Sequence, residues 1–113
     1  MLVIGTNETD MAIAANKLAE IGGGQVVIKK GKVIGLIELT IGGLMSTEKG
    51  NEVAKKANTI LEGFRACGSS LNNPNMTMSL LALVVIPEMR ISDKGLVDVT
   101  HYTFRPVIEG PAE

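Results

Sequence analysis

The pattern of apolar and polar residues predicts two amphipathic helices in this chain. In the first, apolar side chains recur at the three- and four-residue spacing of one helix face: Met11, Ala14, Ala15, Leu18 and Ile21. Asn7 can accept a hydrogen bond from the first turn, and Gly22 stands where a left-handed residue would end the helix. These signals predict a helix that begins after Asn7 and ends at Gly22.

The second predicted helix begins near residue 46 and ends at Gly68. Ser46 or Thr47 is expected to cap its first turn, because either hydroxyl can accept a hydrogen bond from an unpaired N–H. Its apolar face combines Val53, Ala57, Ile60, Leu61, Phe64 and Cys67. Cys67 is therefore interpreted as a small buried hydrophobe.

Strands are predicted for five segments that lie outside these helices. They are residues 2–6, 26–28, 33–39, 78–86 and 97–104. The second and third flank Lys30-Gly31, which is typical of a hairpin. The fourth is apolar, partly β-branched and bounded by Pro74 and Pro87, so we favour a buried strand there, although a helix fits the same pattern. Residues 92–95 predict the turn before the last strand.

These elements predict an α+β fold, a small domain of α/β type. Two main helices would pack on a mixed, mostly antiparallel sheet of about five strands. The length of 113 residues, with 45% hydrophobic and 20% charged residues, is the balance of one compact domain across residues 1–113. Such a chain is long enough to bury a core without a metal or a disulfide.

Charge and composition narrow the choice of partners. The chain has eleven Lys and Arg residues and twelve Asp and Glu residues. The basic residues do not cluster in the sequence as binding to a phosphate backbone requires, so nucleic acid is not an expected partner. The apolar run 80–86 is too short to cross a bilayer, and the first residues lack the features of an export signal. With one cysteine there is no internal disulfide, and we expect a cytoplasmic protein without a membrane partner.

A metal-dependent or nucleophilic active site is not predicted. Activation of water by a metal needs three or four converging ligands. The only histidine, His101, would have to recruit Asp93, Asp98 or Cys67 from separate segments, none of which stands at a ligand spacing. A Cys67–His101 pair is disfavoured because Cys67 lies on the predicted core face. We therefore predict no catalytic residue and no metal ligand in this chain.

Glycine-rich loops are the remaining candidates for binding. The glycines at 22–24 leave a helix rather than enter one, which is the wrong direction for an anion site. The loop Gly42, Gly43, Leu44, Met45 and Ser46 leads toward a helix, so its N–H groups could receive an anion, although it lacks a phosphate-binding lysine. No periodic pattern assigns Leu44 or Met45 to the core, and such residues often contact a partner. These five residues are the candidate ligand or interface site.

Three blocks in order resemble the C-terminal domain of the adenine deaminases of the amidohydrolase superfamily. They are GTNETDMAIAANKLAEIGGGQVVIKKGKV (5–33), IGGLMS (41–46) and NPNMTMSLLALVVIPEMRISDKGLVDV (73–99). Each block is weak alone, but their order is specific, and together they cover nearly the whole chain. The chain departs from the family at Asn75, where an aromatic is usual, and at Val84-Val85.

This resemblance implies a parent enzyme in which the chemistry lies elsewhere. Its (β/α)8 barrel would hold a binuclear divalent metal site, Mn or Fe, that activates water for attack on C6 of adenine, releasing ammonia and hypoxanthine. Those ligands, and a histidine-rich stretch of the family, are expected in segments preceding Met1. The chain itself is then expected to need no cofactor and to be non-catalytic, with a structural, docking or oligomerisation role.

The expected partners are the parent's own barrel, a second copy of the chain, or both. The main alternative is a stand-alone regulatory module that binds a small molecule through the loop from Gly42 to Ser46. An unrelated small enzyme is a third possibility.

Overall fold

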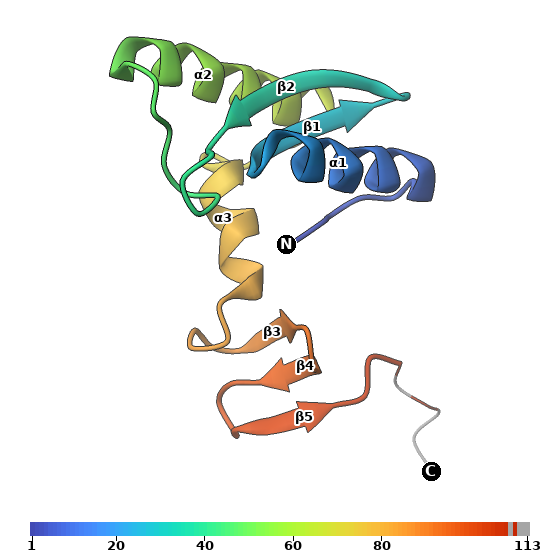
Figure 1. The fold of residues 1–113 in the computed structure, drawn as a ribbon. Coiled ribbons are helices and arrows are strands. Elements are labelled where there is room, and N and C mark those ends of the chain that lie inside the picture. Colours follow the sequence, from blue (N-terminus) through green and yellow to red (C-terminus); the bar gives the residue numbers. More distant parts are fainter. Residues whose placement is uncertain (109, 111–113) are drawn as a thin grey trace. The chain divides into compact units, whose positions relative to one another are not determined.

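The computed structural model describes residues 1–108 and 110, and the chain divides into two compact units at the bond between Asn75 and Met76. The first unit holds helix α1 (Glu8–Ile21), strands β1 (Gly24–Lys29) and β2 (Lys32–Glu38), and helix α2 (Gly50–Ala66) (Figure 1). Helix α3 (Pro74–Ser79) begins at its end. The second unit holds the 3-10 helix η1 (Leu80–Ala82) and strands β3 (Met89–Ser92), β4 (Gly95–Asp98) and β5 (Thr103–Arg105).

The two ends of α1 are capped as the sequence predicts. The side-chain oxygen of Asn7 accepts a hydrogen bond from the Asp10 N–H at 2.9 Å, which satisfies one of the unpaired donors of the first turn. At the other end Gly22 has a φ of 78°, and its N–H donates to the Leu18 carbonyl. This left-handed C-cap turns the chain directly into β1.

Strands β1 and β2 form the predicted antiparallel hairpin around Lys30 and Gly31. Both turn residues have positive φ, 51° and 75°, as a type I′ turn requires. The carboxylate of Asp10 accepts hydrogen bonds from the N–H groups of Lys30 at 2.9 Å and Gly31 at 2.8 Å. The first turn of α1 therefore holds the tip of the hairpin.

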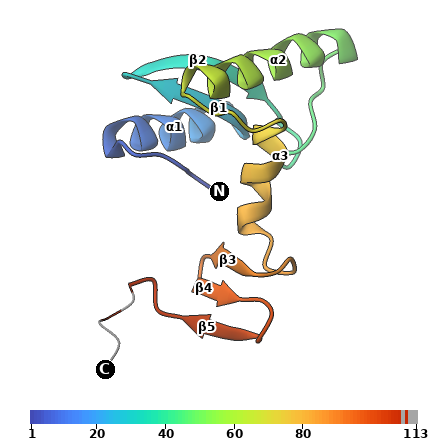
Figure 2. The same cartoon turned by 180° about the vertical axis from the view of Figure 1, so that it is seen from behind.

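Helix α2 packs against β2 and β1 and closes the core of the first unit (Figure 2). The buried residues Val27, Ile37 and Ile60 form this core. Gly35 on β2 allows the helix to approach closely, since a Cβ built there would lie 2.5 Å from the Thr59 carbonyl oxygen. The partly buried residues that pack around the core are Ile34, Leu39, Val53 and Phe64.

The predicted ends of the second helix need correction. Helix α2 begins at Gly50, with Lys49 as N-cap, so neither Ser46 nor Thr47 caps it. The Ser46 hydroxyl instead accepts a hydrogen bond from the Glu48 N–H at 3.1 Å, a local turn that competes with helix. Cys67 is the C-cap and is exposed, because the helix ends at Ala66 before its apolar face reaches the thiol. The prediction that Cys67 is buried was wrong.

The second unit is built on the antiparallel sheet β3-β4-β5. The predicted strand 78–86 was wrong: these residues end α3, form η1 and continue as turns. Their apolar residues follow no two-residue alternation, and Pro74 occupies the first position of α3, where proline favours a helix. The segment 97–104 is divided between β4 and β5, because a turn with Tyr102 at a φ of 53° separates them.

The predicted α+β class is confirmed, but the sheet differs from the expectation. Over residues 1–108 the strands form two antiparallel sheets, of two and three strands, rather than one mixed sheet. Residues 2–6 form no strand. Within the part of the chain that the structure describes, no helix is long and apolar enough to cross a membrane. The prediction of a single domain across residues 1–113 stays a prediction.

We predict that Gly35→Ala destabilises the chain by about 1–3 kcal/mol, because the added methyl group must push apart the backbones of β2 and α2. Gly50→Ala is the matched control, since a Cβ at Gly50 meets open space, and it should change the free energy of unfolding by less than about 0.5 kcal/mol. Urea unfolding followed by circular dichroism measures both. Equal stability of the two variants would contradict the close approach at Gly35.

Candidate functional site

All five predicted site residues lie in the loop between β2 and α2, residues 39–49, which we call the connecting loop. Its tip is a tight turn in which Gly42 and Gly43 have φ values of 64° and 75°. The Ile41 carbonyl accepts hydrogen bonds from the N–H groups of Leu44 at 3.1 Å and Met45 at 3.2 Å, and the Ile41 N–H donates to the Met45 carbonyl at 3.0 Å. The turn is closed by its own backbone.

The tip of the connecting loop is apolar and exposed. Leu44 is 82% exposed and Met45 is 59% exposed, while Ile41 at the base of the turn is about half exposed. Glycines at the two central positions allow the backbone to reverse there without strain, because a positive φ is favourable for residues without a Cβ. The turn therefore presents Leu44 and Met45 together to the surroundings.

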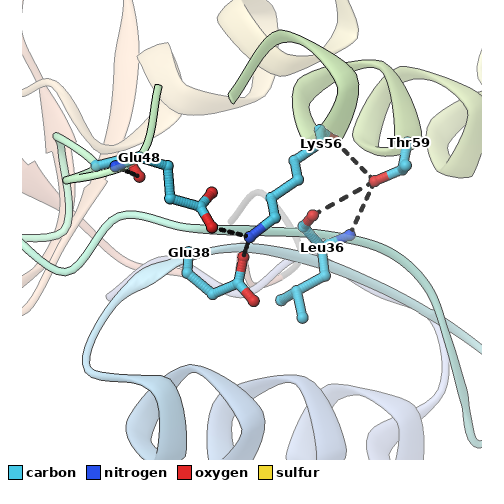
Figure 3. Close-up of polar contacts among 6 residues, drawn as sticks. Leu36, Glu38, Glu48, Lys56 and Thr59 are labelled. Atoms are coloured by element: carbon cyan, nitrogen blue, oxygen red, sulfur yellow. Dashed lines mark hydrogen bonds and ion pairs between the residues drawn. The ribbon is translucent and has the colours of Figure 1, made fainter. Parts of the chain in front are cut away.

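Lys56 on α2 holds both ends of the connecting loop (Figure 3). Its Nζ lies 2.7 Å from Glu38 Oε2, at the end of β2, and 2.8 Å from Glu48 Oε1, just before α2. The hydrogen bond to Glu38, followed by that to Glu48, raises the pKa of Lys56. The same hydrogen bond from Lys56 is the main reason that the pKa of Glu38 is lowered. We call these three residues the Lys56 bridge.

Thr59, one helical turn after Lys56, fixes α2 to the backbone of β2. Its hydroxyl accepts a hydrogen bond from the Leu36 N–H at 3.2 Å and donates to the Lys56 carbonyl at 2.7 Å (Figure 3). Because one face of α2 carries both Thr59 and Lys56, the strand and the loop that leaves it are held by the same helix. The position of the loop tip is thus set by contacts outside the tip.

The structure places the predicted site residues in two settings. Gly42, Gly43, Leu44 and Met45 form the tip, whereas Ser46 lies beyond it and is engaged by the Glu48 N–H. The N–H groups of Leu44 and Met45 point to Ile41 and so are not available to an anion. The loop also reaches α2 only at Gly50, so the tip does not stand at a helix N-terminus.

The Lys56 bridge was missed by the sequence reasoning, although one signal was present. Lys56 lies three residues after Val53 and four before Ile60, which places a cation beside the apolar face of the helix. A half-buried lysine in that position is stabilised when the element that the helix packs on supplies a carboxylate. The glutamates at the two ends of the loop were the available partners.

A second polar cluster lies in the second unit, around Asp98. This carboxylate is only 6% exposed and accepts hydrogen bonds from the backbone N–H of His101 at 3.0 Å and from its Nδ1–H at 2.9 Å. Arg105 donates to it through Nε at 3.2 Å and Nη2 at 3.1 Å. The hydrogen bond from the His101 side chain is the largest cause that lowers the pKa of Asp98.

The Asp98 cluster explains the single histidine as a structural residue. Four donors occupy Asp98, and they fix the turn between β4 and β5. Beside the cluster is a hollow of about 540 Å³, lined by Met89, Leu96, Asp98, Arg105, Pro106 and Val107. Among residues 1–108 and 110, no three His, Cys, Asp or Glu side chains are grouped as metal ligands.

Comparison with known proteins gives one consistent relationship. A family model described as the adenine deaminase C-terminal domain matches residues 1–103. The adenine deaminase of Roseobacter denitrificans is 57% identical over 111 residues, which are 98% of this chain and 18% of that protein. Adenine deaminase 3 of Rhizobium meliloti is 56% identical over 108 residues, 96% of this chain and 18% of that protein.

The similarity extends to relatives of lower sequence identity. The adenine deaminase of Clostridium botulinum is 44% identical over 104 residues, which cover 92% of this chain and 17% of that protein. The chain thus spans less than a fifth of the length of the curated relatives it matches. No solved structure matches it.

We predict that Lys56→Gln lowers the stability of the chain at neutral pH and weakens its dependence on pH in acid. Because the pKa of Glu38 is lower in the folded state, its contribution is complete above the unfolded pKa and is lost as the pH falls through the lowered folded pKa. The difference between wild type and variant should therefore shrink as Glu38 is protonated. Urea unfolding from pH 7 down to about pH 3 measures this difference.

Lys55→Gln is the matched control for the lost positive charge, because Lys55 is adjacent on α2 and forms only an exposed ion pair with Glu52. Its stability should follow that of the wild type across the range. If Lys56→Gln and Lys55→Gln behave alike, the Lys56 bridge does not stabilise the loop.

Proposed function

The chain belongs to the adenine deaminase C-terminal domain family, and from this premise we propose that it is an accessory domain that docks through the tip of the connecting loop. Its partner is the remainder of the deaminase polypeptide, expected to be the catalytic barrel. The observation that carries this proposal is the exposed pair Leu44 and Met45 on a loop whose two ends are fixed by Lys56.

The exposed apolar tip is suited to a protein partner. Leucine and methionine side chains gain free energy when they leave water, and an exposed pair of them is typical of a contact surface. Methionine is flexible and packs well against irregular surfaces. A polar rim is already present, because the Lys56 bridge lies at the base of the same loop.

The fixed ends of the loop favour binding further. Ordering a flexible loop on association costs conformational free energy, and a loop that is already ordered avoids much of that cost. The backbone bonds within the turn and the Lys56 bridge both order the loop before any contact is made. We therefore regard the connecting loop as a preorganised docking element.

The chemistry of the whole enzyme is assigned to the part outside this chain. The relatives are named adenine deaminases, so the parent reaction would be the hydrolysis of adenine, in which water replaces the C6 amino group and yields hypoxanthine and ammonia. The residues and the divalent metal pair for this step would belong to the catalytic part. We propose the cytoplasm as the compartment, because these 113 residues hold a single cysteine, Cys67, and therefore no disulfide within the chain.

The alternative of a small-molecule module is less well supported. It required free N–H groups in the loop from Gly42 to Ser46, and those of Leu44 and Met45 are bonded within the turn. A second copy of the chain is the alternative partner for the same apolar tip. Sedimentation of the chain alone measures this self-association separately from docking to the deaminase.

We predict that Leu44→Asp combined with Met45→Asp weakens docking at least tenfold, because two charges would have to be buried in an apolar contact. The measurement is sedimentation of this chain with the Roseobacter denitrificans deaminase lacking its matching segment. Unfolding stability of the double variant should stay within about 1 kcal/mol of wild type, since both side chains are exposed.

Val33→Asp is the control for a charge on an exposed apolar position away from the loop, since Val33 lies beside the hairpin turn and is 44% exposed. It should bind as the wild type does. Binding by the double variant that equals the wild type, or no binding by the wild type, would rule out docking through this tip. Sedimentation of the chain alone shows any self-association.

We further predict that the purified chain carries no stoichiometric manganese, iron or zinc and releases no ammonia from adenine. The reason is that three or four ligands are needed for such a metal, and the described residues offer no group of three. Metal analysis and an ammonia-release assay test this together. Turnover above a matched blank, in a preparation free of host deaminase, would show that the chain has its own active site.

A further inference from the structure

We propose that the outer edge of β1 is a strand-accepting surface, and that the segment Leu2–Ile4 binds there as a third, parallel strand. The proposal does not depend on the docking function of the connecting loop. It rests on two sets of backbone groups in the first unit that lack partners, and on the helix that connects them.

The outer edge of β1 is open. The Leu39 N–H donates to the Gly23 carbonyl at 3.0 Å, so this facing pair shares a ladder bond. In an antiparallel ladder, hydrogen-bonded and non-hydrogen-bonded residue pairs alternate. The pair Val26 and Leu36 lies three positions along the ladder from Gly23 and Leu39, so it is a non-hydrogen-bonded pair. The backbone N–H and carbonyl of Val26 therefore point away from β2. Those of Ile28 point to the same side, because the irregularity between Val27 and Ile28 places its extra residue on β2.

The two edges of this hairpin differ in whether their outward backbone groups are hydrogen-bonded. On β2, the outward N–H of Leu36 is taken by the Thr59 hydroxyl, so helix α2 covers that edge. On β1, the outward backbone groups of Val26 and Ile28 form no comparable hydrogen bond within residues 1–108. Both residues are half-buried, a setting in which unpaired backbone groups are costly.

The segment Leu2–Ile4 is the matching set of unpaired groups. Within the described residues its backbone makes no hydrogen bond. Its side chains are strand formers, and Ile4 is still 49% exposed, so pairing would also bury apolar surface. Both partners of a strand pair are thus present in one unit without being joined.

The topology brings the segment to β1 in one orientation. The segment precedes α1, and α1 leads into β1 and packs against it, so pairing of the segment with β1 would make a strand, helix and strand unit. Such a crossover places its two strands in parallel, nearly always in the same sheet with a right-handed connection. In the projection of Figure 1 the segment runs in the same direction as β1.

Adding this strand would complete a sheet that is small by itself. A two-stranded hairpin is marginal in water, whereas three strands with a packed helix form an independently stable unit. It would also remove an open edge, which otherwise invites pairing with another chain. The N-terminal segment would then cover the β1 edge of the hairpin, while α2 covers the β2 edge. We call the segment in this position the strap.

Amide hydrogen exchange of the 113-residue chain, resolved by NMR, tests this proposal. If the strap is in place, the N–H groups of Val26 and Ile28 exchange slowly, and nuclear Overhauser contacts join Leu2–Ile4 to β1. Val3→Pro removes a donor from the strap and should speed exchange of the Val26 and Ile28 amides at least tenfold. The Val27 amide, which faces Gly35 inside the hairpin, should stay protected.

Glu8→Pro is the matched control, since Glu8 is the first residue of α1, a position that tolerates proline; it should leave both amides slow. Fast exchange of Val26 and Ile28 in the wild type, or protection that survives Val3→Pro, would overturn the proposal. So would protection that rises with protein concentration, because it would identify a second copy as the occupant. The nuclear Overhauser contacts between Leu2–Ile4 and β1 are measured in the wild type. They test the parallel pairing even if the Val3→Pro variant fails to fold.

Discussion

One lysine determines how the connecting loop is presented. The chain must travel from the end of β2 to the start of α2, and an unrestrained path of that length would be free to take many conformations. Lys56 restricts it by binding a carboxylate at each end of the path. Such a bridge requires that α2 lie close to β2, and this closeness in turn requires a glycine at position 35. The conformation of the connecting loop therefore depends on the packing of α2 against the hairpin.

The hairpin itself depends on a similar long-range contact. Asp10 accepts two backbone N–H groups from the turn between β1 and β2, so the first turn of α1 and the tip of the hairpin are joined. With α1 attached at one place and α2 at another, the small sheet is held by two helices. At the tip of the connecting loop, Leu44 is 82% exposed and Met45 is 59% exposed, so these two side chains contribute little to the packing of the unit. That contrast is why we assign the tip to a partner.

Local rules explain which parts of the fold could be predicted from the sequence. Asn7, Gly22 and the pair Lys30-Gly31 each act through their own backbone conformation or their nearest neighbours, and each was predicted correctly. The segment 78–86 was mispredicted because an apolar run without alternation fits helix and strand alike. In that segment the favourable position of Pro74 at a helix start outweighed the β-branched residues.

The candidate site divides in the same way. The exposed tip could be predicted because Leu44 and Met45 belong to no periodic pattern. The bridge could not, since it joins residues from a strand, a loop and a helix whose proximity exists only in the folded chain. Likewise, the structural role of His101 at Asp98 depends on the turn between β4 and β5, which forms only in the folded chain.

In a complete deaminase, we expect the tip of the connecting loop to be covered by the rest of the protein. Peroxide converts exposed methionines to sulfoxides, and the rate at each position reports its access to solvent. Met45 should oxidise rapidly in the isolated 113-residue chain, where it is 59% exposed, and at least tenfold more slowly when the same residues form part of a full-length deaminase. Equal rates in the two proteins would show that the tip stays in solvent and would contradict docking through Leu44 and Met45.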